Sequence, residues 1–195
     1  MPSAPTRRPS AHDVDRLFLD RWSARAMSGA ALTNAELLTL FEAARWAPSS
    51  GNQQPWRMLY ARRDSDFWPA FLDLLLPANR AWAQRAGALV VMLSRTRLDD
   101  GRACLTHSYD TGAAWENLAL QASLKGLVAH GIQGFDYERA RRVLRVPEEY
   151  AIEAMAVLGK PGSLDDLSES LQAREQPSDR RPLAQSICEG PFSFA

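Results

Sequence analysis

Two stretches near the N-terminus carry apolar residues at helical spacing. Ser10 and Asp13 provide an N-cap signal, and apolar positions then follow at helical intervals, which predicts a short helix that ends near residue 22. Thr33 and Glu36 form a capping-box pattern that opens a second helix, which should run until Pro48 stops it. The apolar stripe of this second helix consists of Leu37, Leu40, Phe41 and Ala44.

Short apolar runs separate the remaining helical patterns and predict strands. The run over 88–93 is apolar at every position, which is typical of a strand covered on both faces, so we expect it in the middle of a sheet. The predicted strands span 57–61, 88–93, 127–132 and 154–158. The predicted helices between and after them span 66–76, 107–125, 136–144 and 164–174.

Four strands interleaved with helices predict a layered α/β or α+β sandwich. The chain shows no internal repeat and no linker, so residues 1–195 are expected to form a single domain. Residues 1–10 are rich in Pro, Ser and Arg and are predicted to be a loose lead-in. Several prolines in 176–195 exclude a long regular element, so this segment is predicted to be an irregular arm.

The helix predicted over 107–125 is unusually rich in small residues. Such residues allow another helix to approach closely, whether that helix belongs to the core of the same chain or to another molecule. Both interpretations remain open from the residues alone. The small residues are Gly112, Ala113, Ala114, Ala119 and Ala122.

Composition and charge exclude several classes of protein. With 46% hydrophobic and 24% charged residues the chain is of ordinary globular type, and its formal net charge of +0 gives no electrostatic footprint for nucleic acid or an anionic membrane. The longest apolar run is far shorter than the roughly 18 residues of a membrane span. No apolar stretch follows the first arginines, so we expect no secretory signal, a soluble protein and a cytoplasmic location.

The sequence offers few groups for metal binding or side-chain catalysis. Cys104 and Cys188 stand far apart without a metal-ligand pattern, which predicts two ordinary thiols, no disulfide framework and no metal site. His12, His107 and His130 lack metal-ligand spacing, although His107 and Asp110 form an i, i+3 pair. The motifs typical of phosphate-loop, dinucleotide-binding, zinc-protease and hydrolase sites are absent.

What remains is a set of hydrogen-bond donors suited to a phosphorylated planar cofactor. Arg21, Ser23 and Arg25 alternate, so in an extended segment they would share one face. The loop over 48–56 carries hydroxyl and amide groups between two prolines. The alternatives are two solvated arginines and a well-formed turn without a ligand.

Five motifs, in order along the chain, resemble those of the FMN-dependent nitroreductase family. They read R-W-S-A-R over 21–25, P-S-S-G-N-Q-Q-P-W over 48–56, G-I-Q-G-F-D over 131–136, G-K-P over 159–161 and R-R-P-L over 180–183. The resemblance covers roughly residues 13–190, and the chain is similar to a compact member of the family. It implies an α+β fold, namely a three-layer α/β/α sandwich around a mostly antiparallel sheet of about four to five strands.

The resemblance also implies roles for basic residues at the cofactor. By their motif positions, Arg21 and Ser23 would bind the FMN phosphate and ribityl chain. Arg25 would lie near the N1/O2 edge of the flavin and stabilise the negative charge that reduction leaves there. Arg180 or Arg181 would grip the phosphate.

Three further positions and one loop complete the implied site. Asn79 matches an asparagine that hydrogen-bonds the pyrimidine side of the flavin, and Gln133 and Gly134 match the turn beside flavin N5. The resemblance places one loop in the site of the partner subunit. Its residues are Pro48, Ser49, Ser50 and Asn52.

The implied protein is a homodimer with FMN at the subunit interface. It would take hydride from NADH or NADPH and pass it through flavin N5 to a nitroaromatic, a quinone or a similar electron-poor small molecule by a ping-pong mechanism. Other flavin chemistries remain alternatives, including dehalogenation, flavin fragmentation and oxidation of ring precursors. A non-catalytic flavin-binding module and an α/β dimer without flavin are further alternatives.

Some positions depart from the family pattern. Trp82 stands where some members have a lysine, so a second positive group near the flavin would be missing or replaced by a stacking surface. Gln133 replaces a glutamate and removes a charge near N5. The small Gly51 and the short connection between Leu93 and His107 predict an open pocket.

Overall fold

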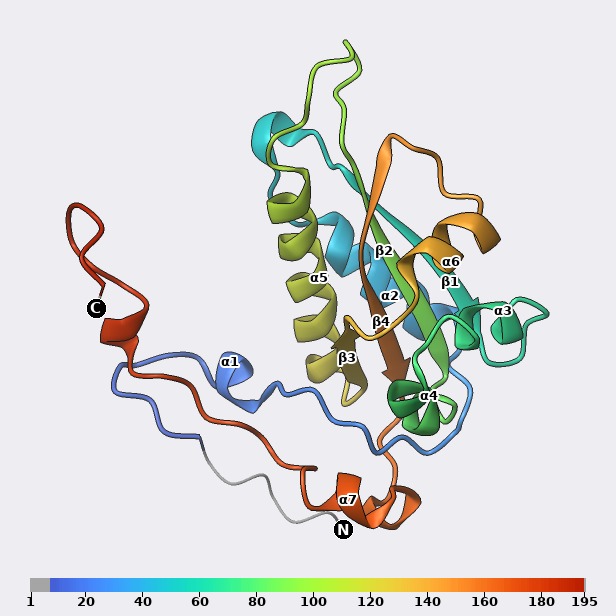
Figure 1. The fold of residues 1–195 in the computed structure, drawn as a ribbon. Helices are drawn as coiled ribbons and strands as arrows, with labels where there is room; N and C mark the ends of the chain where they lie inside the picture. Colours follow the sequence, from blue (N-terminus) through green and yellow to red (C-terminus); the bar gives the residue numbers. More distant parts are fainter. Residues whose placement is uncertain (1–7, 195) are drawn as a thin grey trace.

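The centre of the structure is a sheet with the strand order β1-β2-β4-β3, in which every neighbouring pair is antiparallel (Figure 1). The structure is a computed structural model, and it describes residues 8–194. The predicted mostly antiparallel sheet is therefore confirmed. The strands are β1 (Trp56–Arg62), β2 (Ala88–Arg95), β3 (Val128–Ile132) and β4 (Tyr150–Gly159).

Each face of the sheet is covered by its own layer of helices. Because side chains alternate along a strand, Ala88, Val90 and Met92 of β2 enter one core, while Leu89 and Val91 enter the other. Both cores are needed to bury this uniformly apolar strand, and the predicted three-layer α+β sandwich is confirmed. Helices α2 (Asn34–Arg45) and α5 (His107–Leu124) contribute to the first core, and α3 (Trp68–Leu72), α4 (Pro77–Ala83) and α6 (Tyr137–Val143) to the second.

The helix signals nearest the first core are confirmed in detail. The Thr33 side chain accepts a hydrogen bond from the backbone N–H of Glu36, and the Glu36 carboxylate accepts one from the backbone N–H of Thr33, so the capping box forms. The predicted stripe faces inward, since Leu37, Leu40 and Ala44 are buried. Helix α2 ends at Arg45, before the proline.

The structure corrects several predicted boundaries. Helix α1 (Arg16–Asp20) is shorter than predicted, and its N-cap is Asp15 instead of Ser10 or Asp13. Helix α4 was not predicted, although proline at its first position favours a helix start. Strand β4 begins earlier than predicted because it pairs with β2 beyond a bulge at Met92 and Leu93.

The segment after β4 is less helical than predicted. Instead of one helix over 164–174, it forms the 3₁₀ turn η2 (Leu164–Asp166) and the short helix α7 (Glu169–Gln172). The Ser163 hydroxyl caps η2, and a new N-terminus at Ser168 begins α7. The predicted irregular arm that follows contains the short 3₁₀ turn η3 (Leu183–Gln185).

Helix α5 uses most of its small residues inside the chain. Ala114, Ala119 and Ala122 are buried against the first core, which confirms their interpretation as core residues. Gly112 is exposed, and a methyl group added there would meet no atom within 4 Å. This side of α5 is open to a second molecule. None of the described helices is long and apolar enough to cross a membrane.

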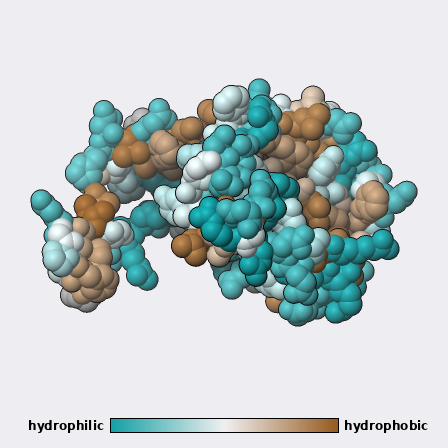
Figure 2. All heavy atoms as spheres, turned by 90° about the horizontal axis from the view of Figure 1, so that it is seen from above, coloured by the Kyte–Doolittle hydropathy of each residue, from teal (hydrophilic) through white to brown (hydrophobic). Residues whose placement is uncertain are grey.

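The C-terminal arm extends away from the body of the protein (Figure 1). The space-filling view shows hydrophobic surface on a lobe that projects from the main mass (Figure 2). Ile187 and Phe192 of the arm are 59% and 84% exposed. The arm runs near the N-terminal segment, since one shallow pocket is lined by His12 together with Leu183, Ala184, Ile187, Cys188 and Glu189. Residues 1–7 of the predicted lead-in lie outside the described part of the chain.

Candidate functional site

The first predicted site segment, residues 21–25, is an extended stretch fixed to the end of the sheet. The imidazole Nδ1 of His130 in β3 lies 2.9 Å from the carbonyl oxygen of Ala24, which accepts its hydrogen bond. Met27 forms an isolated antiparallel bridge with Pro161, just after β4. These contacts hold the segment beside β3 and β4 with Arg21, Ser23 and Arg25 half-buried.

Arg21 belongs to a cluster of arginines. Its Nε lies 3.7 Å from Oε1 of Glu116 in α5, and its carbonyl oxygen accepts a hydrogen bond of 2.5 Å from Nη2 of Arg8. Burial, followed by the positive charges of Arg180 and Arg21, lowers the pKa of the Arg8 guanidinium. Positive charge therefore accumulates where the N-terminal segment meets the C-terminal arm, an arrangement suited to an anion.

The two arginines of the predicted R-R-P-L motif differ in their relation to this cluster. Arg180 donates hydrogen bonds to the carbonyl oxygens of Ser178 and Asp179, and its charge acts on Arg8. Arg181 is exposed, and within residues 8–194 it makes no hydrogen bond or ion pair through its side chain. Sequence reasoning missed Arg8, because a basic residue in a Pro-rich lead-in gives no sign that it will meet Arg21.

Arg25 is held by a carboxylate that sequence reasoning also missed. Glu175 accepts hydrogen bonds from the backbone N–H groups of Arg25 and Ala26 at 2.5 and 2.8 Å. Its second carboxylate oxygen lies 3.5 Å from Nη1 of Arg25. Glu175 is distant in sequence from this segment, and no motif marks it.

The predicted residues Asn79 and Gly134 contact each other. The Asn79 amide donates a 3.1 Å hydrogen bond to the carbonyl oxygen of Gly134, and the backbone N–H of Leu76 donates another of 3.1 Å. A Cβ at Gly134 would lie 2.5 Å from Nδ2 of Asn79, so a larger residue there would displace the Asn79 amide from this contact. Gln133 is exposed beside this contact.

The predicted loop over 48–56 is rigid and tied to α5. The buried carboxylate of Asp110 accepts hydrogen bonds from the backbone N–H of Ser50 at 3.2 Å and from the Thr106 hydroxyl at 3.0 Å. The Ser49 hydroxyl accepts one from the backbone N–H of Gln54. The 3₁₀ turn η1 (Ser50–Asn52) presents the exposed Asn52 in a left-handed conformation with φ 56°.

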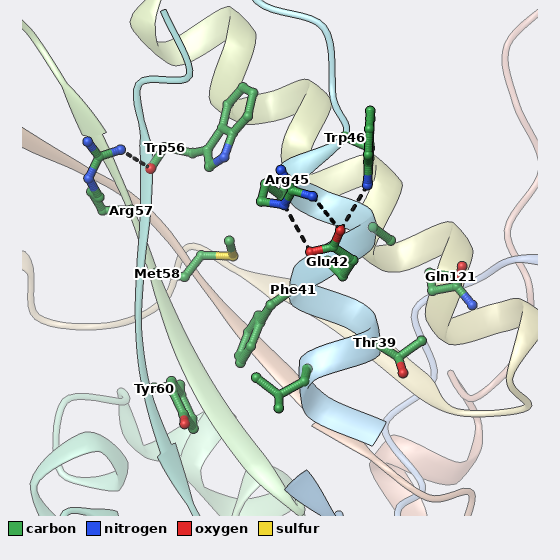
Figure 3. A pocket seen from close by; sticks show the side chains of 12 residues that line it. Thr39, Phe41, Glu42, Arg45, Trp46, Trp56, Arg57, Met58, Tyr60 and Gln121 are labelled. Atoms are coloured by element: carbon green, nitrogen blue, oxygen red, sulfur yellow. Dashed lines mark hydrogen bonds and ion pairs between the residues drawn. The ribbon is translucent and has the colours of Figure 1, made fainter. Parts of the chain in front are cut away.

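The contacts described above divide the predicted site residues into three groups within one chain. The first lies around the 21–25 segment, the second is the contact of Asn79 with the 133–134 turn, and the third is the loop before β1. Among the described residues, no hydrogen bond or ion pair joins this loop to residues 21–25. A groove of about 900 Å³ lies between α2, β1 and α5 and is lined by none of the predicted site residues (Figure 3).

Two other sequence interpretations change with the structure. Trp82 is 2% exposed and packs its ring 4.7 Å from that of His130, so it belongs to the core and offers no open stacking surface. His107 does not pair with Asp110. Its Nδ1 lies 2.7 Å from the hydroxyl of the buried Ser94, which also donates to Glu153, so it belongs to a polar cluster at the start of α5.

The donors of the first two groups suit a phosphorylated cofactor with a polar ring. Burial and then the charges of Arg180 and Arg21 lower the pKa of Arg8, so a phosphate dianion beside these arginines would offset the part that comes from charge repulsion. Arg25, Asn79 and the 133–134 turn carry further groups that can hydrogen-bond a ring. All three groups keep exposed or half-buried polar residues available to a ligand.

Comparisons with known proteins agree with this fold. The Nitroreductase family profile matches residues 19–160. A solved structure described as the oxidoreductase containing FMN is 43% identical, with a TM-score of 0.93, and the match covers 96% of this chain and 97% of that one. A protein called NADH dehydrogenase from Thermus thermophilus is 27% identical, with 90% of this chain and 95% of that protein covered. An uncharacterized 15.4 kDa protein of Mycolicibacterium smegmatis is 31% identical over 57% of this chain and 75% of its own length.

Proposed function

The chain belongs to the nitroreductase family, and from that premise we propose that it is an FMN-dependent oxidoreductase that uses NADH or NADPH to reduce small electron-poor molecules. Nitroaromatics and quinones are the acceptors we expect. The observation that carries the proposal is the arginine cluster of Arg8, Arg21 and Arg180 beside the half-buried Arg25. The 43% identical structure described as containing FMN supports the same cofactor.

In this proposal the arginine cluster holds the FMN phosphate. Arg21 and Ser23 bind it from the extended segment, Arg180 binds it from the arm, and Arg8 adds a further guanidinium. Arginine suits this task because its planar donors match phosphate oxygens and its charge persists at all physiological pH values. Arg180 is favoured over Arg181 because its charge acts on Arg8.

The ring-binding residues orient the flavin and stabilise charge. Bound FMN supplies the hydride-transfer chemistry, so the protein needs no acid–base pair of its own. Arg25 is proposed to face the N1/O2 edge, and Asn79 the pyrimidine side. Gln133 and Gly134 are proposed to border N5, where the contact between Asn79 and Gly134 keeps the turn rigid.

A homodimer would complete the site. The loop over 48–56 is proposed to bind the FMN of the partner subunit through Pro48, Ser49, Ser50 and Asn52, since within one chain it is not joined to residues 21–25. Asp110 holds this loop in shape from α5. The exposed Gly112 on α5 and the projecting apolar arm are surfaces that a second copy would cover.

The first test is the visible absorption spectrum of the purified protein, before and after reconstitution with FMN. We expect flavin bands that bleach with NADPH or NADH under anaerobic conditions and return when a quinone or nitroaromatic is added. Return of the bands separates an oxidoreductase from a flavin-storage module. A colourless protein that cannot be reconstituted with FMN would reject the proposed cofactor.

The second test is the molecular mass of the protein that carries FMN. We expect light scattering to give twice the mass of the 21.7 kDa chain, with the flavin co-eluting. The kinetic pattern should be ping-pong, because nicotinamide and acceptor would use the same open flavin face in turn. A monomer that retains FMN would contradict the shared site.

A further inference from the structure

The carboxylate of Glu175 is almost fully enclosed at the point where the C-terminal arm begins. Its side chain is 5% exposed. It accepts hydrogen bonds from the backbone N–H groups of Arg25 and Ala26 and lies against the Arg25 guanidinium. A buried carboxylate is costly unless it is paired and hydrogen-bonded, and these donors meet that need.

His130 is a titratable group close to this pair. It packs between Trp82 and the 21–25 segment, where its imidazole donates to Ala24. Burial lowers the pKa of His130, and the charge of Arg25 lowers it further, whereas the hydrogen bond to Ala24 and the charge of Glu175 oppose that effect. His130 therefore favours its neutral form and adds no positive charge beside Arg25 and Glu175 at neutral pH.

We infer that Glu175 is a positioning residue that orients Arg25 and offsets its charge, and that it thereby sets how easily the flavin is reduced. The inference rests on the proposed function, because it requires FMN near Arg25. Glu175 fixes Arg25 at both the backbone and the side chain, so the guanidinium keeps one direction. None of the five motifs of the sequence analysis contains Glu175 or another carboxylate that holds Arg25.

The sign of the effect follows from electrostatics. Reduction places negative charge on the flavin ring, and a positive Arg25 stabilises that charge. A nearby carboxylate weakens the stabilisation, and solvent screens this effect only partly because the Glu175 side chain is enclosed. Glu175 therefore keeps the flavin less easily reduced than Arg25 alone would make it.

The experiment compares the flavin reduction potential of the wild-type holoenzyme with that of Glu175→Gln. Glutamine retains a side-chain oxygen that accepts from the two backbone N–H groups, but it removes the negative charge. We expect reduction to become about tenfold more favourable, which for a two-electron couple is a rise of about 30 mV. Glu175→Asp, which keeps the charge, should lie closer to the wild-type potential.

Asp166→Asn is the matched control. Asp166 lies 3.0 Å from Nη2 of Arg85, and Arg85 donates to the carbonyl oxygen of Met27, so this pair supports the neighbouring part of the same segment. This variant removes one negative charge from a residue that does not contact Arg25, so its flavin reduction potential should equal that of the wild type. Thermal unfolding of each variant separates a loss of stability from a change in potential.

The outcomes are distinct. A flavin reduction potential that rises in Glu175→Gln alone supports the inference. An unchanged or lower potential in Glu175→Gln overturns it. An equal rise in the potential of Glu175→Asp or Asp166→Asn also overturns it. If Glu175→Gln does not fold, Glu175→Ala, which also removes the charge, takes its place: a raised potential supports the inference, and a wild-type potential overturns it. A wild type that binds no FMN rejects the proposed function and the inference with it.

Discussion

Replacement of Arg25 by alanine is expected to lower the rate of flavin reduction by NAD(P)H by about 10²-fold. The guanidinium is the proposed donor to the flavin edge where negative charge develops, and alanine leaves no donor in that position. The fold should persist, because Glu175 keeps hydrogen bonds from the backbone N–H groups of residues 25 and 26. Stopped-flow absorbance of the FMN-loaded variant measures the effect.

Two further variants test whether this effect is specific to Arg25. Arg25→Lys keeps the charge but loses the planar donor group, so its rate should lie between those of the wild type and Arg25→Ala. Arg62→Ala removes an arginine at the end of β1, which is the opposite edge of the sheet from β3. Arg62 pairs with Asp64, and its removal should leave the rate unchanged. A wild-type rate in Arg25→Ala would remove Arg25 from the site.

Replacement of Gly162 by alanine is expected to reduce the free energy of unfolding by about 3 kcal/mol, at the upper end of typical overpacking costs. A Cβ at this position would lie 2.4 Å from the backbone carbonyl carbon of Met27 and 2.8 Å from the backbone N of Ser28. Backbone atoms cannot rotate away as a side chain can. The hydrogen bond from the Gly162 N–H to the Ala26 carbonyl, 3.0 Å long, would also be strained.

Gly159→Ala provides the matched comparison, because it packs against the same residue. Its Cβ would lie 2.7 Å from the Sδ of Met27, and a flexible thioether can move. We expect a loss of about 1 kcal/mol in urea denaturation. Equal losses in the two variants would contradict the argument from backbone contact. FMN affinity should fall in Gly162→Ala as well, since the strained segment carries Arg21 and Arg25.

Much of the fold follows from local rules that the sequence states directly. The uniformly apolar 88–93 run predicts a strand buried on both faces, because alternating side chains must enter two cores, and the structure confirms this. The capping box at Thr33 and Glu36 marks the start of α2, since it uses only neighbouring residues. Antiparallel pairing needed more than local rules and came with the family resemblance, whereas the strand order was given only by the structure.

Tertiary contacts decide the elements that local rules missed. The first residues of β4 lack a uniform apolar pattern, and they become a strand because β2 offers partners as far as Arg95. The segment over 164–174 has helical spacing, but the Ser163 cap and a break at Leu167 divide it into two short turns. The spacing of apolar residues shows neither effect: the extension of β4 depends on atoms brought from elsewhere in the chain, and the division of 164–174 depends on a local cap at Ser163 that lies outside the apolar pattern.

The candidate site divides in the same way. The sequence by itself determined which residue types are available and where the motifs lie, because a motif is a local pattern that survives in the printed letters. Only the tertiary structure decided that Arg8 contacts Arg21 and lies near the charge of Arg180, that Glu175 holds Arg25, and that Trp82 is core. These contacts join residues far apart in the chain, and their energies come from burial and from charges that approach one another only after folding.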